Sequence, residues 1–190
     1  LLVKALDTVV ALDVKAKIWD LSSFEEGTSL PDDGVIVIDA DQYIKKQDTA
    51  KGSFYRIDGY GNYGVAMKVA PSTAAFGETD AKPALTYQFW LEQEGDYLVE
   101  CLCAPTNPSS SGTAMHLSLS DGAGKQKILE MVPADFCAGD TKDPRWCKGV
   151  LDQVRIVSTT WQFDAGVQNI SVSPLETGLV LERLRIYPAD

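Results

Sequence analysis

The sequence has little of what nucleic-acid-binding surfaces and many active sites require. It contains one histidine in 190 residues, and its 27 acidic residues outnumber its 17 basic residues, which gives a formal net charge of -10 at pH 7. Such a chain would repel a phosphate backbone or an anionic lipid surface before contact. We therefore expect no nucleic acid and no membrane among its partners.

Long apolar runs are also missing. No segment approaches the roughly 20 consecutive apolar residues that a membrane-spanning helix needs. The chain starts at Leu1 without a methionine or a charged leader, so we expect a mature or excised piece of a longer protein. With 45% hydrophobic and 23% charged residues, the composition is that of an ordinary globular protein, and we predict a single domain over residues 1–190.

The single histidine, His116, limits the catalytic chemistry that we expect. It shares a predicted strand face with Ser118 and Ser120, which places it on the wetter side of the strand. The chain has no G-x-S-x-G nucleophile motif, and only this one histidine is present to activate a thiol. A glycosidase needs two suitably spaced carboxylates, but among so many acidic residues some pair always qualifies. We therefore predict that the protein is not an enzyme, and an independent glycoside hydrolase is the least favoured alternative.

The chain consists instead of short extended segments separated by turns. Apolar and polar residues alternate with a period of two in residues 85–91, which is the pattern of a strand with one buried face. Glycine-rich turns such as residues 58–64 and 121–124 separate the segments. About ten or eleven such strands predict an all-β fold, an antiparallel β-sandwich of jelly-roll type. The expected strands are residues 8–18, 35–38, 53–57, 65–69, 85–91, 97–103, 113–120, 126–132, 150–158, 167–172 and 179–187.

The same pattern divides the chain into two parts. Residues 1–34 are expected to form an N-terminal strand and connector, and residues 35–190 the core of the module. Residues 44–51 and 136–147 are expected to be loops, and no amphipathic helix is expected. Trp161, which follows two β-branched residues, is expected to be a core residue.

The four cysteines form two pairs of different character. Cys101 and Cys103 lie two positions apart in a predicted strand, so both face the same way, and we expect them to be buried. Cys137 and Cys147 lie in a Gly/Asp/Pro-rich stretch that would gain from a covalent link, and we predict a disulfide between them. A disulfide implies an oxidising compartment, so we expect the protein to be secreted or on the cell surface. A four-cysteine zinc site is the weaker alternative, because paired C-x-x-C knuckles are missing.

The order of several short motifs resembles a known group of proteins. These motifs are residues 37–43, 57–61, 85–91, 95–97, 166–170 and 181–186. Together they resemble the carbohydrate-binding modules of families 6 and 35, which are β-sandwiches that often carry a structural calcium ion. Residues 146–187 are more similar still to the C-terminal domain of glycoside hydrolase family 115, the xylan α-glucuronidases. The resemblance runs from about Val35 to the end of the chain.

The resemblance implies calcium ligands at Asp39, Asp41 and Glu182. The modules usually carry glutamates where this chain has the two aspartates, and an aspartate where it has Glu182. Calcium prefers carboxylate oxygens, which all three side chains supply, so the expected cofactor is a structural Ca²⁺. The sugar-contacting asparagine that these modules carry in their last loop has no counterpart in residues 173–178.

Sugars are bound by flat aromatic faces and by planar polar groups that hydrogen-bond to hydroxyls. The first candidate is Trp146, with Asp143 and Arg145 beside it, because a disulfide-linked loop would hold an exposed indole in place. The alternative is that Trp146 caps one end of the sandwich.

Two further places have the same combination of residues. Tyr60 and Tyr63 flank Asn62 in a glycine-rich turn, and Trp90 stands on the polar face of its strand. The alternatives are that the tyrosines pack over a sheet edge and that the N-terminal strand or a neighbouring domain covers Trp90.

These features predict a non-catalytic module that binds plant cell-wall polysaccharide, xylan or another hemicellulose, and that is joined to the catalytic domain of a secreted glycoside hydrolase. The alternative is a structural or dimerising C-terminal domain of such an enzyme, whose aromatic residues pack against a partner rather than against a sugar.

Overall fold

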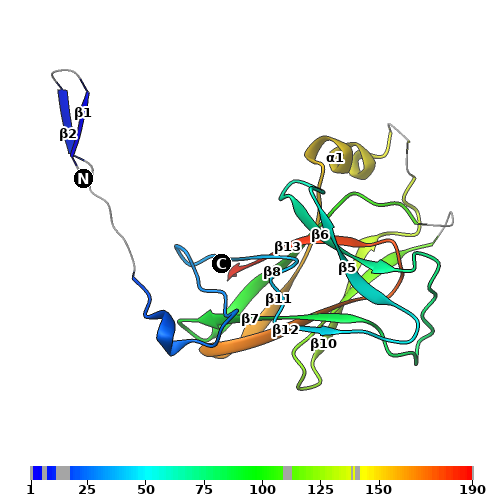
Figure 1. Ribbon diagram of the computed structural model, residues 1–190. Coiled ribbons are helices and arrows are strands. Elements are labelled where there is room, and N and C mark those ends of the chain that lie inside the picture. Colours follow the sequence, from blue (N-terminus) through cyan, green and yellow to red (C-terminus); the bar gives the residue numbers. More distant parts are fainter. Residues whose placement is uncertain are drawn as a thin grey trace.

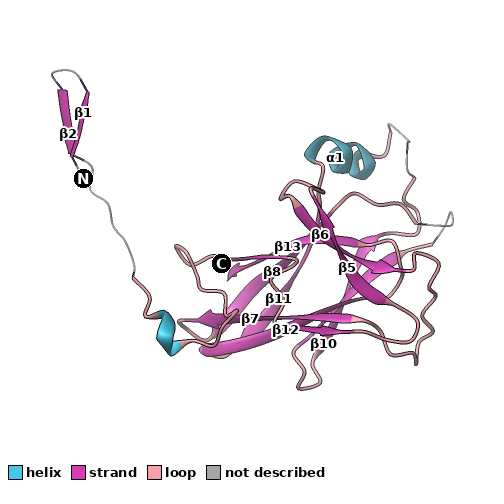
Figure 2. Ribbon diagram, in the orientation of Figure 1, coloured by secondary structure: helices cyan, strands magenta, loops and turns pink. Residues whose placement is uncertain are grey.

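The computed structural model describes residues 2–5, 8–11, 18–108, 113–137, 139 and 142–189. Eleven strands in this part of the chain form two antiparallel sheets that pack face to face (Figure 1). Strands dominate the molecule (Figure 2). The predicted all-β sandwich of ten or eleven strands is therefore confirmed.

The first sheet has five strands in the order β10-β9-β12-β7-β4. Every neighbouring pair in it is antiparallel. Beyond β4, the backbone of Ser29 forms an isolated parallel bridge with Phe89 of β7. The strands are β4 (Lys45–Gln47), β7 (Ala84–Leu91), β9 (Met115–Ser120), β10 (Gln126–Val132) and β12 (Gly166–Pro174).

The second sheet has six strands, in the order β11-β8-β13-β6-β5, with β3 also paired to β13. The last strand, β13, changes partner along its length: Val180 and Leu181 pair with β6, and from Arg183 onward the strand pairs with β3. Its pairing with β8 shifts register between Leu181 and Arg183, which leaves Glu182 at a bulge. The strands are β3 (Ile36–Asp39), β5 (Ser53–Asp58), β6 (Val65–Ala70), β8 (Gly95–Cys103), β11 (Arg155–Phe163) and β13 (Val180–Pro188).

Alternating residues of both sheets fill the core. On β7 the buried residues Tyr87 and Phe89 point inward, and Phe89 meets Phe163 of the opposite sheet edge to face, with ring centroids 5.2 Å apart. Trp161 is 1% exposed, as expected, and stacks against Phe163. The alternation that the sequence shows is therefore the one that the sheets use to bury their inner faces.

The cysteines of β8 behave as predicted. Cys101 and Cys103 are fully buried in the core, and burial raises the pKa of the Cys101 thiol to about 12. Neither thiol is therefore a reactive nucleophile at neutral pH.

Three boundary predictions are wrong. Residues 144–152 form a helix, α1 (Pro144–Asp152), where a loop and the start of a strand were expected. The strand that was expected from residue 150 begins at Arg155, and part of the expected loop at residues 44–51 is the short strand β4. Asp143 caps α1 and Pro144 occupies its first turn, a start signal that outweighed the loop-like composition. No helix in the described ranges is long and apolar enough to cross a membrane.

The N-terminal part also differs from the expectation. The first part of the strand predicted at residues 8–18 is a strand, β2 (Thr8–Ala11), but it pairs in a hairpin with a strand that was not expected, β1 (Leu2–Ala5). Positions 12–17 lie outside the described residues. From Ile18 the chain runs through a single 3₁₀ turn, η1 (Leu21–Ser23), to the edge of the five-stranded sheet.

Glu182 lies fully buried under the turn that joins β5 to β6. Its Oε2 accepts a hydrogen bond from the backbone N–H of Asn62 (3.0 Å), and its Oε1 has no hydrogen-bond partner among the described residues. Burial raises the pKa of this carboxyl. Gly61 has a left-handed backbone, and a Cβ there would overlap the Glu182 carboxylate. Only glycine fits this position without moving Glu182.

Replacing Gly61 by alanine is therefore expected to destabilise the fold more than the same change at Gly59. Both positions have left-handed φ angles, +72° and +68°, so both variants carry a backbone cost of about 1 to 2 kcal/mol. Only Gly61→Ala adds a steric clash, because a Cβ at Gly59 meets nothing within 4 Å. Urea denaturation should show a further loss of about 1 to 2 kcal/mol for Gly61→Ala. Equal losses would show that the turn does not press on Glu182.

Candidate functional site

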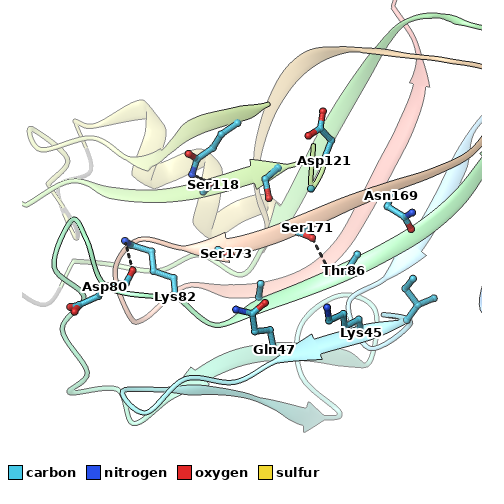
Figure 3. Close-up of a pocket in the computed structure, with 15 residues that line it drawn as sticks. Lys45, Gln47, Asp80, Lys82, Thr86, Ser118, Asp121, Asn169, Ser171 and Ser173 are labelled. Atoms are coloured by element: carbon cyan, nitrogen blue, oxygen red, sulfur yellow. Dashed lines mark hydrogen bonds between the residues drawn. The ribbon is translucent and has the colours of Figure 1, made fainter. Parts of the chain in front are cut away.

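The outer face of the five-stranded sheet carries an open groove of about 690 Å³ (Figure 3). All five strands of the sheet contribute side chains to it, together with the loop before β7 and the β9–β10 turn. None of its fifteen lining residues is aromatic, and ten carry a hydroxyl, a carboxamide or an amine. The groove is thus a hydrogen-bonding surface that lies on regular secondary structure.

One row of polar side chains crosses the whole sheet. Strand pairing places its members directly opposite one another, and paired residues point to the same face. The Thr86 and Ser171 hydroxyls are 2.8 Å apart, and Gln126 reaches sideways to the Ser118 hydroxyl at 2.5 Å. The row is Lys45, Thr86, Ser171, Ser120 and Gln126.

A second line of surface positions runs along β12. Asn169, Ser171 and Ser173 alternate with the buried residues Ile170 and Val172. The labelled side chains of Asn169 and Ser171 lie along the groove in Figure 3. From Asn169 to Ser173 this line is about 13 Å long, at roughly 3.3 Å per residue. The floor therefore offers evenly spaced hydrogen-bonding groups to an elongated ligand.

The charged side chains at the two ends of the groove hold their own loops. Asp121 accepts hydrogen bonds from the backbone N–H groups of Ala123 (2.8 Å) and Lys125 (3.1 Å), which fixes the β9–β10 turn. Asp80 pairs with Lys51 at 2.5 Å, and the hydrogen bond from Lys51 lowers the pKa of the Asp80 carboxyl. Both carboxylates of the lining are engaged, so the arrangement favours binding over acid–base chemistry.

Trp90 lies on the same face of β7, beyond the groove, and the N-terminal segment packs on it. Trp19 and Phe24 meet its ring edge to face, with centroids 5.2 and 5.7 Å away. Between this aromatic cluster and Thr86, Gln88 is hydrogen-bonded by Thr28 (2.7 Å). Residues 18–28 therefore pack on the outer face of β7 beyond the groove and partly cover Trp90.

The first group of predicted binding residues, Asp143, Arg145 and Trp146, lies at the start of α1. Arg145 donates to both carboxylate oxygens of Asp143 (2.9 and 2.8 Å) and pairs with Asp135 (2.8 Å). Hydrogen bonds from Arg145 hold the pKa of the Asp143 carboxyl well below its usual range. Trp146 is partly buried and packs against the core. These contacts match the alternative that Trp146 caps the sandwich.

The predicted disulfide between Cys137 and Cys147 is wrong, because both residues are thiols in the structure. The stretch has regular structure after all: Cys147 lies within α1, and its backbone N–H bonds to the carbonyl of Asp143. The backbone N–H of Cys137 donates to the Asp143 carboxylate (3.4 Å). The helix cap and the Arg145 contacts hold the segment in place of a covalent link.

The second predicted group lies in the β5–β6 turn, next to α1. Asn62 joins the two through a hydrogen bond from its side chain to the carbonyl of Asp152 (3.1 Å). Tyr60 is 42% exposed, whereas Tyr63 lies under the guanidinium of Arg183, 3.8 Å from the ring centroid. The first and second predicted groups therefore meet at one end of the sandwich, while Trp90 stands apart on the five-stranded sheet.

The three carboxylates predicted to bind calcium have separate partners. Asp39 pairs with Arg183 (2.7 Å), Asp41 pairs with Arg56 (3.0 Å), and Glu182 lies under Gly61. Across the described ranges no group of three or more His, Cys, Asp or Glu side chains could hold a metal ion. The orphaned oxygen of Glu182 alone would suit a cation, so the residues as a set do not fit calcium.

Sequence reasoning missed the groove. Its signal was present in the alternation of small polar residues with apolar ones at 118–120 and 169–173. That alternation predicted strands, but it did not reveal which strands are neighbours.

Comparisons with known proteins agree with this fold. The family model described as "Glycosyl hydrolase family 115 C-terminal domain" matches residues 29–190. None of the curated proteins matches the chain in sequence.

Among solved structures, the chain is similar to a family GH115 4-O-methyl-α-glucuronidase with specificity for decorated arabinogalactans (TM-score 0.54, 16% identity). That match covers 78% of this chain but only 18% of the enzyme.

Two carbohydrate-binding modules match over almost their full length. A family 35 module from Clostridium thermocellum has a TM-score of 0.53 at 8% identity, over 82% of this chain and 98% of the module. The module CsCBM6-3 from Clostridium stercorarium, in complex with cellobiose, has a TM-score of 0.51 at 14% identity, over 87% of this chain and all of the module. At these identities the likeness establishes the fold.

The structure also makes a prediction for α1. Trp146→Ala is expected to lower the free energy of unfolding by about 2 to 3 kcal/mol, because it leaves a gap beside the core. Leu151→Ala is the control on the same helix: Leu151 is 81% exposed, and the loss should stay within about 0.5 kcal/mol. Urea denaturation measures both. An unchanged stability of Trp146→Ala would instead show that Trp146 does not support the core.

Proposed function

Since this chain belongs to the glycosyl hydrolase family 115 C-terminal domain family, we propose that it is a non-catalytic domain that binds polysaccharide in the groove of the five-stranded sheet. The observation that carries the proposal is the row of five polar side chains across that sheet. The expected ligand is a plant cell-wall polysaccharide, xylan or another hemicellulose, and the domain acts as an appendage of a secreted glycoside hydrolase.

The chemistry of the groove supports a carbohydrate ligand. A sugar chain presents hydroxyls at regular intervals, each a hydrogen-bond donor and acceptor, and the hydroxyls and carboxamides of the groove are donors and acceptors too. Because these side chains stand on paired strands, few of them lose much freedom on binding. The related fold of CsCBM6-3, in complex with cellobiose, gives a precedent for a sugar ligand on such a sandwich.

The groove has no aromatic side chain in its lining on which a sugar ring could stack, so affinity depends on hydrogen bonds. Hydrogen bonds to neutral sugars replace hydrogen bonds to water, so each contributes only about 0.5 to 1.5 kcal/mol. The expected affinity is therefore modest for short oligosaccharides, and it should rise with chain length as more of the floor is used.

A second function, a structural or dimerising domain, is favoured by one observation. On α1, Leu151 is 81% exposed and Val150 is 48% exposed, and Ile156 on the following strand is 44% exposed. Exposed apolar side chains of this kind suit contact with another protein surface. In this alternative the partner is the rest of the enzyme or a second copy of the chain.

Affinity electrophoresis through gels that contain xylan, arabinogalactan or mixed-linkage glucan tests the first proposal. The chain should be retarded in at least one gel. Ser171→Trp fills the middle of the groove and should weaken binding at least tenfold. Ser158→Trp is the control, because it places the same indole at an exposed position of β11 in the other sheet and should bind as the unmodified chain does.

The other outcomes separate the alternatives. If Tyr60→Ala abolishes retardation and Ser171→Trp does not, the sugar binds at the loop end near α1 instead of in the groove. Absence of retardation in every gel, together with a molar mass that rises with concentration, would favour the structural function.

A further inference from the structure

Arg183 joins three parts of the chain at the edge where β3, β6 and β13 meet. It stands directly opposite Asp39 in the pairing of β13 with β3, and its Nε and Nη2 both lie 2.7 Å from the same Asp39 oxygen. The flat guanidinium also stacks on Tyr63, 3.8 Å from the ring centroid, in the β5–β6 turn. One side chain therefore connects two strands and a turn.

A second arginine extends this arrangement. Arg56 on β5 donates through Nε to Asp41 (3.0 Å) and forms an ion pair through Nη1 with Asp58 (2.5 Å). Asp41 lies just beyond the end of β3, so Arg56 ties that segment to β5. With Arg183, it neutralises the two aspartates that the resemblance assigns to calcium.

A calcium ion would have to displace these contacts. Calcium takes six to eight oxygen ligands at about 2.3 to 2.6 Å, and two guanidinium groups close to the same carboxylates oppose a divalent cation. The third expected ligand, Glu182, is separately fixed by the backbone N–H of Asn62 under Gly61.

We infer that Arg183 and Arg56 take the place of a structural calcium ion in this chain, by neutralising Asp39 and Asp41 and tying β3 to β5, to β13 and to the β5–β6 turn. A guanidinium keeps its charge at all physiological pH values and cannot be removed by a chelator. The domain therefore folds to the same stability whether calcium is present or absent.

Thermal unfolding of the full 190-residue chain, dialysed against EDTA and then measured with and without calcium chloride, tests this inference. The melting temperature should be the same within about 1 °C. A metal site filled at about a hundred times its dissociation constant would instead raise the melting temperature of a domain of this size by roughly 5 to 10 °C. A rise of that size with calcium, or a matching fall in EDTA, would overturn the inference.

Variants then test the arginine itself. Arg183→Gln should lower the melting temperature by about 2 to 6 °C, because Asp39 loses its partner and Tyr63 loses its stacked guanidinium. Arg183→Lys keeps the charge but lacks the planar guanidinium. Its melting temperature should lie between those of Arg183→Gln and the unmodified chain. If Arg183→Gln does not fold, Arg183→Lys carries the test, and a melting temperature equal to that of the unmodified chain would contradict the inference.

A double-mutant cycle separates this pair from a general loss of charge. The effects of Asp39→Asn and Arg183→Gln on the free energy of unfolding should be coupled. The double variant should lose less stability than the sum of the losses of the two single variants. Arg185→Gln is the matched control, since Arg185 lies two residues further along β13 and pairs with Glu100 instead (2.6 Å). The stability loss of Arg185→Gln should simply add to that of Asp39→Asn in the double variant. Additive stability losses for Asp39→Asn and Arg183→Gln would contradict the inference.

Discussion

Each strand of a sandwich has to bury one face, and this constraint determines what the other face can do. On β12, Ile170 and Val172 fill the core, so Asn169, Ser171 and Ser173 are left on the surface. Hydrogen bonding between strands then sets the register, which brings those side chains level with polar residues of the neighbouring strands. The groove therefore arises from the packing of the core, and no loop needs to change shape to create it.

The alternation of apolar and polar residues correctly predicted strands and buried positions. Features that depend on the order of strands in a sheet or on the capping of a helix were not predicted. The strand at 85–91 and the buried Trp161 follow from residues close in the chain, and both are where the alternation placed them. The helix α1 was missed, since its start depends on a capping aspartate followed by proline within a stretch of loop-like composition. The groove was missed for a different reason: Thr86 and Ser120 become neighbours of Ser171 only through sheet order, which alternation does not encode.

Most of the polar and aromatic residues that the sequence marked for binding have structural partners. Asp143 and Arg145 build the start of a helix, Asn62 fastens a turn to that helix, and Tyr63 supports a guanidinium. A residue type suited to contact a ligand is equally suited to hold a loop, and in a chain with few helices the loops need many such contacts. The small hydroxyl residues of the groove, which attract less notice in a sequence, are the ones whose side chains still face outward along the groove.

The cover over Trp90 bears on where this domain begins. Trp19 and Phe24 precede the region that the family model matches, yet both rings pack on an indole inside it. An excised fragment starting at residue 29 would retain every strand of the two sheets while leaving that indole uncovered beside the groove. Such a fragment would expose an apolar ring that the intact chain partly covers, and it would therefore be prone to self-association. The aromatic packing around Trp90 therefore extends upstream of the region that the family model matches.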